Sequence, residues 1–353
     1  MNIHLRMMKK RNKSNQILYL MLILLFAPML NHAQNRIGER VMFYNVENLF
    51  DTKDDPDKND EEFLPNGDRR WTNNRFFLKL NRVSQVIIAA GEGKYPAVVG
   101  LAEIENQNVL ETLLHSTSLG KLGYQIIHKE SPDNRGIDVA FLYQKGLFTP
   151  KRYNAIPVIN PKDPAFKTRD ILYVKGELGK DTIHFFVNHW PSKYGGLGAT
   201  VPLRALAASI LKTYTDSILF CNPESNIVIM GDFNDSPFDE SIKDVLAALP
   251  PDDSVSNNKL YDLAYPLARK GIGSNKFHSE WDMIDQFIVS GHMLRGSNKI
   301  TSPESFHVFS PPFLLEDDKT YLGKKPNRTY NGFTYHGGFS DHLPVLLDIN
   351  LDN

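Results

Sequence analysis

The chain lacks several features that would assign it to a specialised class of protein. Among its 353 residues Cys221 is the only cysteine, so an intrachain disulfide is excluded. Basic and acidic residues number 40 and 41, and this balance argues against a protein that is held to polyanions by bulk charge. The composition, 41% hydrophobic and 23% charged, argues against collagen-like, coiled-coil and disordered chains. Stability must therefore come from an apolar core, and any affinity for nucleic acid must be local.

The charge is unevenly distributed at the N-terminus. The first 33 residues contain five basic residues and no acidic residue, which leaves a formal net charge of −6 on the rest of the chain. The basic residues precede an apolar run, 17–30, and a small-residue end at Ala33, a pattern typical of a secretory signal peptide. A membrane anchor is the alternative, but the run is shorter than the roughly 20 residues that span a bilayer. We expect cleavage near Ala33 and a secreted or periplasmic protein without a stable membrane anchor.

Helical and strand patterns alternate along the remaining chain. Apolar residues recur at helical spacing over residues 76–90, 203–218 and 238–249. Short apolar runs predict strands over residues 41–45, 97–101, 124–128, 137–143, 171–177, 183–188, 227–230, 283–289 and 343–349. Several of these strands follow one another without a helix between them. The sequence therefore predicts mixed β-sheets, not purely parallel ones.

An acidic stretch over residues 51–62 predicts a loop. Asp55, Asp57, Asn59 and Glu61 have the alternate spacing of a calcium-binding loop. The glycine of the tight turn is absent, however, and the position of the closing glutamate is Asn66. A solvated acidic loop is the favoured interpretation.

Polar side chains lie at the ends of six predicted strands, or within them. They are Asn45, Glu47, Glu103, Asn188, His189, Asp232, Asn234, Asp285, Asp341 and His342. Each one alone has an ordinary explanation as a cap, a turn residue or a structural histidine. Together they indicate a site, because open α/β sheets place ligands beyond the strand ends and an unpaired buried carboxylate is costly.

The residue types in this set favour a hard divalent cation. With one cysteine and no His-x-x-x-His pair, there is no standard structural zinc site, and carboxylate oxygens suit Mg²⁺, Mn²⁺ or Ca²⁺. Magnesium binds through one or two carboxylates, keeps several waters and contacts substrate phosphate. Hydrolysis of a phosphoester fits such a site, because the cation neutralises phosphoryl oxygens while a base activates water.

Six short blocks carry a resemblance to a known family. They are Asn45-Val46-Glu47, Leu101-Ala102-Glu103, Asn188-His189, Gly231-Asp232-Phe233-Asn234, Ile284-Asp285-Gln286-Phe287 and Ser340-Asp341-His342-Leu343-Pro344-Val345. In order and spacing they resemble the endonuclease/exonuclease/phosphatase superfamily, which includes deoxyribonucleases, apurinic endonucleases, inositol polyphosphate 5-phosphatases and neutral sphingomyelinases. The resemblance implies an α+β fold, a four-layer α/β sandwich in which two mixed β-sheets pack face to face with outer helices. Residues 34–353 would then form a single catalytic domain.

The same resemblance implies roles for the polar residues. Glu103 would be the principal metal ligand, with Asn45, Glu47 and Asp341 near the cation. The catalytic residues would be His342 and Asp285, which form a pair, together with Asp232, Asn234 and His189. Asp232 and Asn234 would position the water and the phosphate. His189 is typical of the deoxyribonuclease-like branch. The implied mechanism is in-line attack by water without a covalent enzyme intermediate. Whether Asp232 or His342 accepts the proton of the water is left open.

The substrate depends on the loops around the site. Cations and aromatics alternate over residues 324–336, as on a strand-binding surface, with an ordinary solvent-facing loop as the alternative. Candidate substrate-binding residues are Arg135, Asp138, Arg169, Lys193, Arg328 and Tyr335, several of which could instead form structural ion pairs. The expected partner is nucleic acid or another phosphoester substrate, and no protein partner is implied.

A nuclease is the leading interpretation of function. His189 is typical of the deoxyribonuclease-like branch, and export suits the scavenging of environmental nucleic acid. A phosphatase or phospholipase that acts on inositol phosphates or sphingolipids is the second interpretation. A third is a binding protein that kept the fold and lost the chemistry, and it ranks last because every expected polar position is filled.

Overall fold

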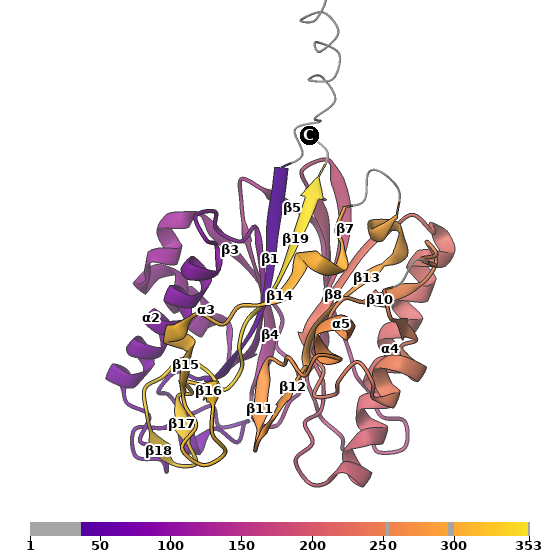
Figure 1. The fold of residues 1–353 in the computed structure, drawn as a ribbon. Coiled ribbons are helices and arrows are strands. Elements are labelled where there is room, and N and C mark those ends of the chain that lie inside the picture. Colours follow the sequence, from indigo (N-terminus) through magenta and orange to yellow (C-terminus); the bar gives the residue numbers. More distant parts are fainter. Residues whose placement is uncertain (1–36, 252–253, 296–299, 352–353) are drawn as a thin grey trace, which may run out of the picture. The chain divides into compact units, whose positions relative to one another are not determined.

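Two mixed β-sheets form the centre of the computed structural model, which describes residues 37–251, 254–295 and 300–351 (Figure 1). The first sheet has the order β14 (Phe306–Val308), β19 (Val345–Leu351), β1 (Ile37–Leu49), β2 (Val98–Ile104), β4 (Asp138–Gln144) and β3 (Tyr124–His128). The second has the order β5 (Phe148–Ile156), β6 (Ile171–Leu178), β7 (Asp181–His189), β8 (Asn226–Asp232), β13 (Asp285–Ser290), β10 (Leu260–Asp262) and β9 (Ala248–Leu249). Parallel pairs such as β1–β2 and β7–β8 occur beside antiparallel pairs such as β2–β4 and β8–β13.

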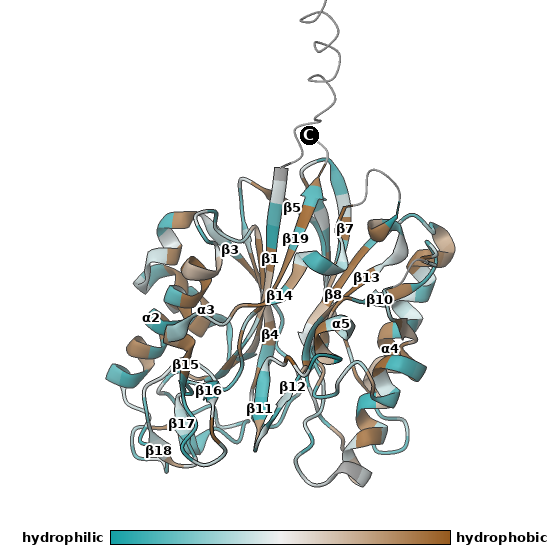
Figure 2. Cartoon of the chain, in the orientation of Figure 1, coloured by the Kyte–Doolittle hydropathy of each residue, from teal (hydrophilic) through white to brown (hydrophobic). Residues whose placement is uncertain are grey.

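The two sheets pack face to face through an apolar layer. Val41 and Phe43 of β1 and Phe141 of β4 meet residues of the second sheet such as Phe185 and Phe287. The rings of Phe141 and Phe185 lie 5.4 Å apart, centroid to centroid. Alternate residues of each strand face this layer, and Figure 2 shows the hydrophobic colouring along the central strands of both sheets. Burial of this layer supplies the core that the chain needs without disulfides.

Helices cover the outer face of each sheet. These outer helices are α2 (Asn73–Ala90), α3 (Gln107–Ser116) and α4 (Leu197–Cys221). The short α5 (Tyr265–Ala268) instead packs through Leu267 and Ala268 against the layer between the sheets. Helices α2 and α3 pack on the first sheet, where Leu80 and Leu110 share one core cluster with Leu101. Helix α4 packs on the second sheet, where Leu211 meets Ile229. The order helix, sheet, sheet, helix confirms the four-layer sandwich.

Short elements fill the connections between the layers. The hairpins are β11 (Asn275–Phe277) with β12 (Glu280–Asp282), β15 (Leu315–Asp317) with β16 (Lys324–Pro326), and β17 (Tyr330–Asn331) with β18 (Thr334–Tyr335). The helical turns are Glu61–Phe63, Ser118–Leu122, Ser241–Val245, Gly291–Leu294, Pro303–Ser305 and Pro312–Leu314. The acidic stretch 51–62 is a loop, as expected, and its last two residues enter the first of these turns.

One predicted helix is wrong. Helical spacing over residues 238–249 predicts a helix, but the chain forms a single π-helical turn, Ser241–Val245, and then the short strand β9. Phe238 and Leu249, at the two ends of the pattern, are 43% and 38% exposed, so only its middle is buried. Pro250 and Pro251 follow directly and cannot extend a helix. Strand β5 and helix α3 were not predicted from the sequence.

The predicted signal peptide, residues 1–33, lies outside the described residues, so its cleavage and the export that it implies stay expectations. Within residues 37–251, 254–295 and 300–351 no helix has the length and apolar character needed to cross a membrane. Cys221 ends α4 and is exposed.

Candidate active site

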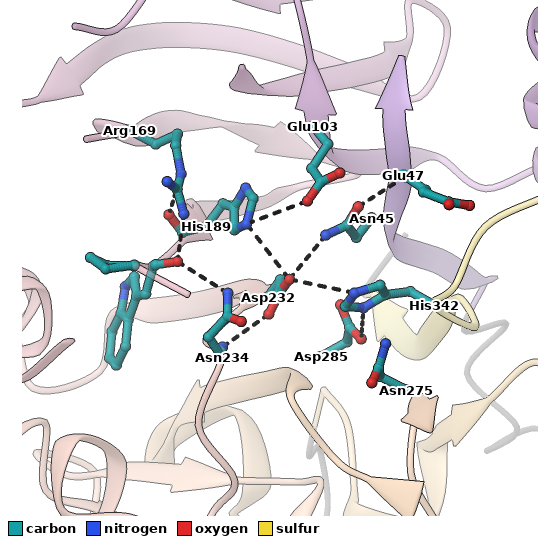
Figure 3. A network of polar contacts seen from close by, with 12 residues as sticks. Asn45, Glu47, Glu103, Arg169, His189, Asp232, Asn234, Asn275, Asp285 and His342 are labelled. Carbon is teal, nitrogen blue, oxygen red and sulfur yellow. Dashed lines mark hydrogen bonds and ion pairs between the residues drawn. The ribbon is translucent and has the colours of Figure 1, made fainter. Parts of the chain in front are cut away.

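Strand register brings the polar residues of the second sheet together at one edge. Asp232, the last residue of β8, pairs with His189 on the parallel strand β7. On its other side Asp232 pairs with Asp285, the first residue of the antiparallel strand β13. His342 precedes β19 of the first sheet and reaches this edge, where its Nδ1 bonds Asp285 (Figure 3). Four segments distant in sequence therefore meet at Asp232.

Direct contacts join the first sheet to Asp232. The Asn45 amide nitrogen donates to Asp232 Oδ2 over 2.9 Å. His189 Nε2 lies 3.7 Å from Asp232 Oδ2 and 3.9 Å from Glu103 Oε1 of the first sheet. Figure 3 shows Asn45, Glu103, His189 and His342 directed toward Asp232 from different strands. The site is thus a buried cluster of polar side chains that both sheets contribute at one edge.

Backbone conformations that are rare for residues other than glycine cluster at this edge. Glu47, Asn48, Glu103 and Asn234 have φ values of 54°, 52°, 63° and 51°. Such conformations cost about 1 kcal/mol or more each and gather at functional sites. At Glu103 the left-handed turn interrupts the alternation of β2, and the Asn48 amide donates to Glu103 Oε2 over 2.8 Å. The strained turns thus set the direction of the Glu103 carboxylate.

His342 and Asp285 form a buried pair with firm support. His342 Nδ1 lies 2.7 Å from Asp285 Oδ2, and the same oxygen accepts the Ser274 hydroxyl at 2.5 Å. The Ser340 hydroxyl oxygen accepts the His342 amide at 3.0 Å and donates to the Asn45 carbonyl, so it ties the histidine to β1. Burial opposes the charged imidazole, but Asp285 and Asp232 outweigh it and raise the pKa of His342 well above its usual value.

Asp232 and His189 are shifted in the direction of their neutral forms. Burial raises the pKa of Asp232 to about 7, although the backbone amide of Asn234 and the side chain of Asn45 donate to the carboxylate. Burial, followed by Arg169 and Arg135, lowers the pKa of His189 well below its usual value. The lowered pKa of His189 favours its neutral form and the raised pKa of His342 favours its charged form, so the two imidazoles can have different roles.

Glu47 is directed away from Asp232. Its Oε2 accepts the Thr329 amide over 2.6 Å and its Oε1 accepts the Tyr330 amide over 3.3 Å, so both oxygens fix the segment that leads to His342. Figure 3 shows the Glu47 carboxylate pointing out of the cluster. Arg328 lies between the acids, with Nη2 2.9 Å from Asp341 Oδ2 and Nε 3.6 Å from Glu47 Oε1. Although burial acts in the opposite direction, Arg328 and His342 hold the pKa of Asp341 below its ordinary value.

The residues present fit a magnesium-like cation. The Glu103 side chain is 14% exposed, and its Oε1 lies 3.9 Å from His189 Nε2, beyond hydrogen-bond distance. Asp341 bonds Arg328 through Oδ2, and its Oδ1 can serve as a second oxygen ligand. The Asn45 oxygen, which accepts the Glu47 amide, also lies at this edge. One or two carboxylates with water and phosphate is the ligand set that Mg²⁺ prefers.

Four of the six candidate substrate-binding residues make structural contacts. Arg169 is buried and donates to Asp133 Oδ2 and to the carbonyls of His189 and Trp190. Tyr335 packs beneath Arg75, with 4.1 Å between guanidinium carbon and ring centroid. Asp138 lies with His128 on the first sheet, and Arg328 bonds Asp341.

Arg135 and Lys193 remain accessible. Arg135 has a side chain that is 46% exposed and lies 3.9 Å from Asp133. Lys193 is exposed in the loop that follows His189. Of the candidate residues for substrate, these two can still reach a ligand at the surface.

Supporting residues beyond the strand ends went unrecognised in the sequence. Ser274 and Ser340 hold the His342–Asp285 pair, and only Ser340, inside the Ser-Asp-His block, carried a signal. Lys79 is 2% exposed and donates from Nζ to the Thr329 hydroxyl over 2.6 Å and to the Phe339 carbonyl over 2.5 Å. A lysine beside Leu80 on the apolar face of α2 was the available signal for this buried anchor.

Comparison with known families decides the assignment of the fold. A family model described as the endonuclease/exonuclease/phosphatase family matches residues 40–351. The chain belongs to this family. No curated protein matches it in sequence. The class of reaction follows from the family: the chain is a metal-dependent phosphoester hydrolase.

Solved structures of this family share the fold at low sequence identity. An endonuclease/exonuclease/phosphatase family protein from Bacteroides thetaiotaomicron is 14% identical with a TM-score of 0.54, over 90% of this chain and 100% of that chain. Truncated TDP2 from Caenorhabditis elegans is 15% identical with a TM-score of 0.53, over 89% and 98%. A mannosyl-6-phosphatase from Bacteroides thetaiotaomicron is 13% identical with a TM-score of 0.54, over 88% and 99%.

Proposed function

We propose that this endonuclease/exonuclease/phosphatase protein is an exported, magnesium-dependent phosphodiesterase that cleaves nucleic acid by in-line attack of water. One observation carries the proposal: His189, Asp285 and His342 converge on Asp232 from separate segments at one edge of the sheets. Such a convergence of acid, base and hydrogen-bond donors is what phosphoester hydrolysis needs. Export rests on the N-terminal sequence pattern alone.

In the proposed mechanism each residue acts at a stated atom. Glu103 and Asp341 would hold a divalent cation, which would supply charge stabilisation to the phosphoryl oxygens. His342 Nε2 lies 3.8 Å from Asp232 Oδ2 and donates to a phosphoryl oxygen, while Asp285 holds its ring and its charge. His342 is protonated and cannot accept a proton, so Asp232 orients the water and accepts its proton.

Two further side chains orient this reaction. The Asn234 amide nitrogen donates to the Trp190 carbonyl over 3.1 Å, which directs the side-chain oxygen of Asn234. His189 lies between Glu103 and Asp232, and its pKa is lowered, so it donates to the phosphate as a neutral imidazole. Neither residue needs to move to reach Asp232.

An exposed aromatic residue supports nucleic acid as the substrate. Tyr194 is 94% exposed and lies in the loop that runs from His189 to α4, beside the exposed Lys193. A free aromatic ring next to a cation suits stacking on a base and contact with the next phosphate. Among the structural relatives, Danio rerio TDP2, 13% identical with a TM-score of 0.53, is complexed with a single-strand DNA product.

A sugar phosphate is the second candidate substrate, and charge pairing favours it. The lysines and the arginine of residues 324–336 form ion pairs within the chain: Lys324 pairs with Asp317, Lys325 with Glu316 and Arg328 with Asp341. A surface with few free cations suits a small substrate better than a long polyanion. The mannosyl-6-phosphatase of Bacteroides thetaiotaomicron shares the fold.

A substrate panel tests both candidates. Purified protein is assayed with Mg²⁺ or with a chelator against single-stranded DNA, duplex DNA, RNA and mannose 6-phosphate. Glu103→Gln, Asp232→Asn and His342→Ala are each expected to lower turnover by about 10²-fold or more with little loss of fold. Turnover of all three variants at the level of the unaltered protein would refute the site.

The exposed tyrosine separates the two substrates. Tyr194→Ala is expected to raise KM for single-stranded DNA by about tenfold, which corresponds to one lost base stack, and to leave a small chromogenic diester unaffected. Phe220→Ala is the matched control, because Phe220 is 91% exposed on α4. Cleavage of mannose 6-phosphate alone would replace the nuclease proposal by the phosphatase proposal.

A further inference from the structure

A second cluster of metal-ligating side chains lies on the first sheet, apart from the residues around Asp232. It consists of His128 at the end of β3, Glu130 just beyond it and Asp138 at the start of β4. Ligand atoms of the three side chains lie within 4.8 Å of one another. The cluster shares no residue with the group formed by Asp232, Asp285 and His342.

Strand register brings His128 and Asp138 to the same face of the sheet. His128 pairs with Ala140 in the antiparallel pair β3–β4, and Asp138 lies two residues from Ala140 on the same strand. Residues two apart on a strand share a face, and diagonal neighbours across two strands come within reach of long side chains. Ala140 packs with α2 and α3, so the two ligands lie on the face that these helices cover.

An unsatisfied buried nitrogen points to a missing ligand. The His128 side chain is 2% exposed, and its Nε2 makes no hydrogen bond within the described part of the chain. This nitrogen faces Asp138 Oδ2 at 3.3 Å, too poorly aligned for a hydrogen bond. A separation of about 3.3 Å is what two ligands of a tetrahedral ion have when each bond is about 2.0–2.1 Å long. A buried polar atom of this kind is costly unless something fills the gap.

The Asp138 carboxylate is fixed for this role. Its Oδ1 accepts the Ser131 amide over 2.9 Å and also the Ser131 hydroxyl. With Oδ1 held in this way, Oδ2 is turned toward His128, as the second shell of a metal site orients a carboxylate ligand. Glu130 is 57% exposed, and its Oε1 lies 3.8 Å from His128 Nδ1, the ring nitrogen that does not face Asp138. Ligand atoms of all three side chains nevertheless lie within 4.8 Å of one another, so a rotation of this exposed side chain can bring Glu130 to the ion from the solvent side.

We propose that His128, Glu130 and Asp138 bind a second divalent cation of the zinc or manganese class, separate from the catalytic centre. One imidazole with two carboxylates suits these metals better than Mg²⁺ or Ca²⁺, which prefer oxygen ligands alone. Water completes the coordination. The ion binds no substrate and fixes the loop between β3 and β4.

The loop between β3 and β4 connects the proposed cation to the active site. Asp133 in this loop accepts Arg169 Nη1 over 3.0 Å, and Arg169 donates to the carbonyls of His189 and Trp190. Lys58 Nζ donates to the carbonyls of Ser131 and Asp133 over 3.0 Å each. A cation at the base of the loop therefore steadies the backbone that positions His189.

Calorimetric titration with Zn²⁺ tests the proposal on the purified, chelator-treated protein. Asp138→Asn keeps an oxygen for Ser131 and replaces the ligand oxygen by an amide nitrogen, so the fold is preserved. Glu130→Gln changes an exposed side chain. One Zn²⁺-binding event is expected to weaken by about 10- to 100-fold or more in both variants and to persist in Glu103→Gln. His115→Gln, an exposed histidine on α3, is the matched control and should leave the titration unchanged.

The outcomes separate this inference from the proposed catalytic function. Persistence of the event in Glu103→Gln and its loss in Asp138→Asn would establish the second site even if the assays of hydrolysis failed. Zn²⁺ should also raise the Tm of the unaltered protein and of Glu103→Gln, but not of Asp138→Asn. Unchanged affinity and stoichiometry in both Asp138→Asn and Glu130→Gln would overturn the proposal and leave His128 and Asp138 as a structural pair.

Discussion

Replacement of Asp285 by asparagine removes the charge that holds His342 and leaves the shape of the site almost unaltered. The pair is buried, with the Asp285 and His342 side chains 1% and 8% exposed and 2.7 Å between Oδ2 and Nδ1. At an effective dielectric constant of about 20, two unit charges at this distance attract by about 6 kcal/mol. Desolvation of both groups offsets part of this attraction. We expect a net loss of about 3–4 kcal/mol in the transition state, which is a fall of about 10²- to 10³-fold in kcat.

The fold should tolerate this change. The asparagine side chain of the Asp285→Asn variant keeps an oxygen that can accept Ser274 and His342, as Asp285 Oδ2 does. Its amide nitrogen takes the place of Asp285 Oδ1, which already lacks a hydrogen-bond partner in the described residues. The free energy of unfolding should therefore fall by only about 1–2 kcal/mol, the cost of one unsatisfied buried donor.

Steady-state kinetics on a chromogenic phosphodiester and urea unfolding measure the two quantities separately. Asp285 and Asp232 raise the pKa of His342, so loss of one acid should also move the alkaline limit of activity to lower pH. Asp216→Asn, on the exposed face of α4, is the control and should change neither quantity. An Asp285→Asn protein with full turnover and an unshifted pH profile would refute the argument.

Three further substitutions test the supporting structure. Burial raises the pKa of Asp262 to about 7, so its stabilising contribution is complete below the unfolded pKa and is lost as pH rises through 7. Between pH 4 and pH 8, the unfolding free energy of Asp262→Asn should rise by about 2–4 kcal/mol relative to that of the unaltered protein, as measured by urea unfolding. A difference between the two proteins that does not change with pH would contradict this. Lys79→Met removes the hydrogen bonds from Lys79 to the Thr329 hydroxyl and the Phe339 carbonyl. We expect kcat/KM to fall about tenfold and the free energy of unfolding to fall by about 2–3 kcal/mol. Lys212→Met, at an exposed lysine of α4, is the control. Equal effects of the two substitutions would refute the supporting role of Lys79. Arg169→Gln removes the nearer cation from the buried Asp133 and leaves Arg135 Nε, 3.9 Å away, as the other cation beside it. Urea unfolding should show a loss of about 3 kcal/mol, and a loss below about 1 kcal/mol would show that the Arg169–Asp133 pair is dispensable.

Much of the site could be predicted because its residues stand at strand ends. A run of apolar residues followed by an acid or a histidine is visible in the sequence. The register of β7, β8 and β13 then places His189, Asp232 and Asp285 side by side. The mixed sheets followed from the order of strand and helix patterns, whereas the outer helices were implied by the resemblance to the family. Burial confirmed the apolar faces of α2 and α4 in the same way.

The remaining features could not be predicted because they depend on contacts between distant residues. Glu47 accepts the amide of Thr329, 282 residues away, and nothing local in the sequence shows that its carboxylate turns from Asp232. In the sequence Arg169 is a candidate for binding substrate, but in the fold it is buried and pairs with Asp133. The helix expected over 238–249 failed because helical spacing does not reveal which of its residues the neighbouring layers cover.

The balance of charge around the site explains why its acids tolerate burial. Glu47, Glu103, Asp232, Asp285 and Asp341 approach one edge of the sandwich, and the cations among them are Lys79, Arg328 and the protonated His342. Two of these cations pair with an acid, His342 with Asp285 and Arg328 with Asp341. The Lys79 ammonium bonds Thr329 and Phe339, and the charge of Glu47 acts on it to raise its pKa against the effect of burial. Glu103 and Asp232 both approach His189 Nε2, at 3.9 Å and 3.7 Å. A divalent cation held by Glu103 would complete the neutralisation where a phosphate must enter, because an anionic substrate would otherwise meet the Glu103 carboxylate.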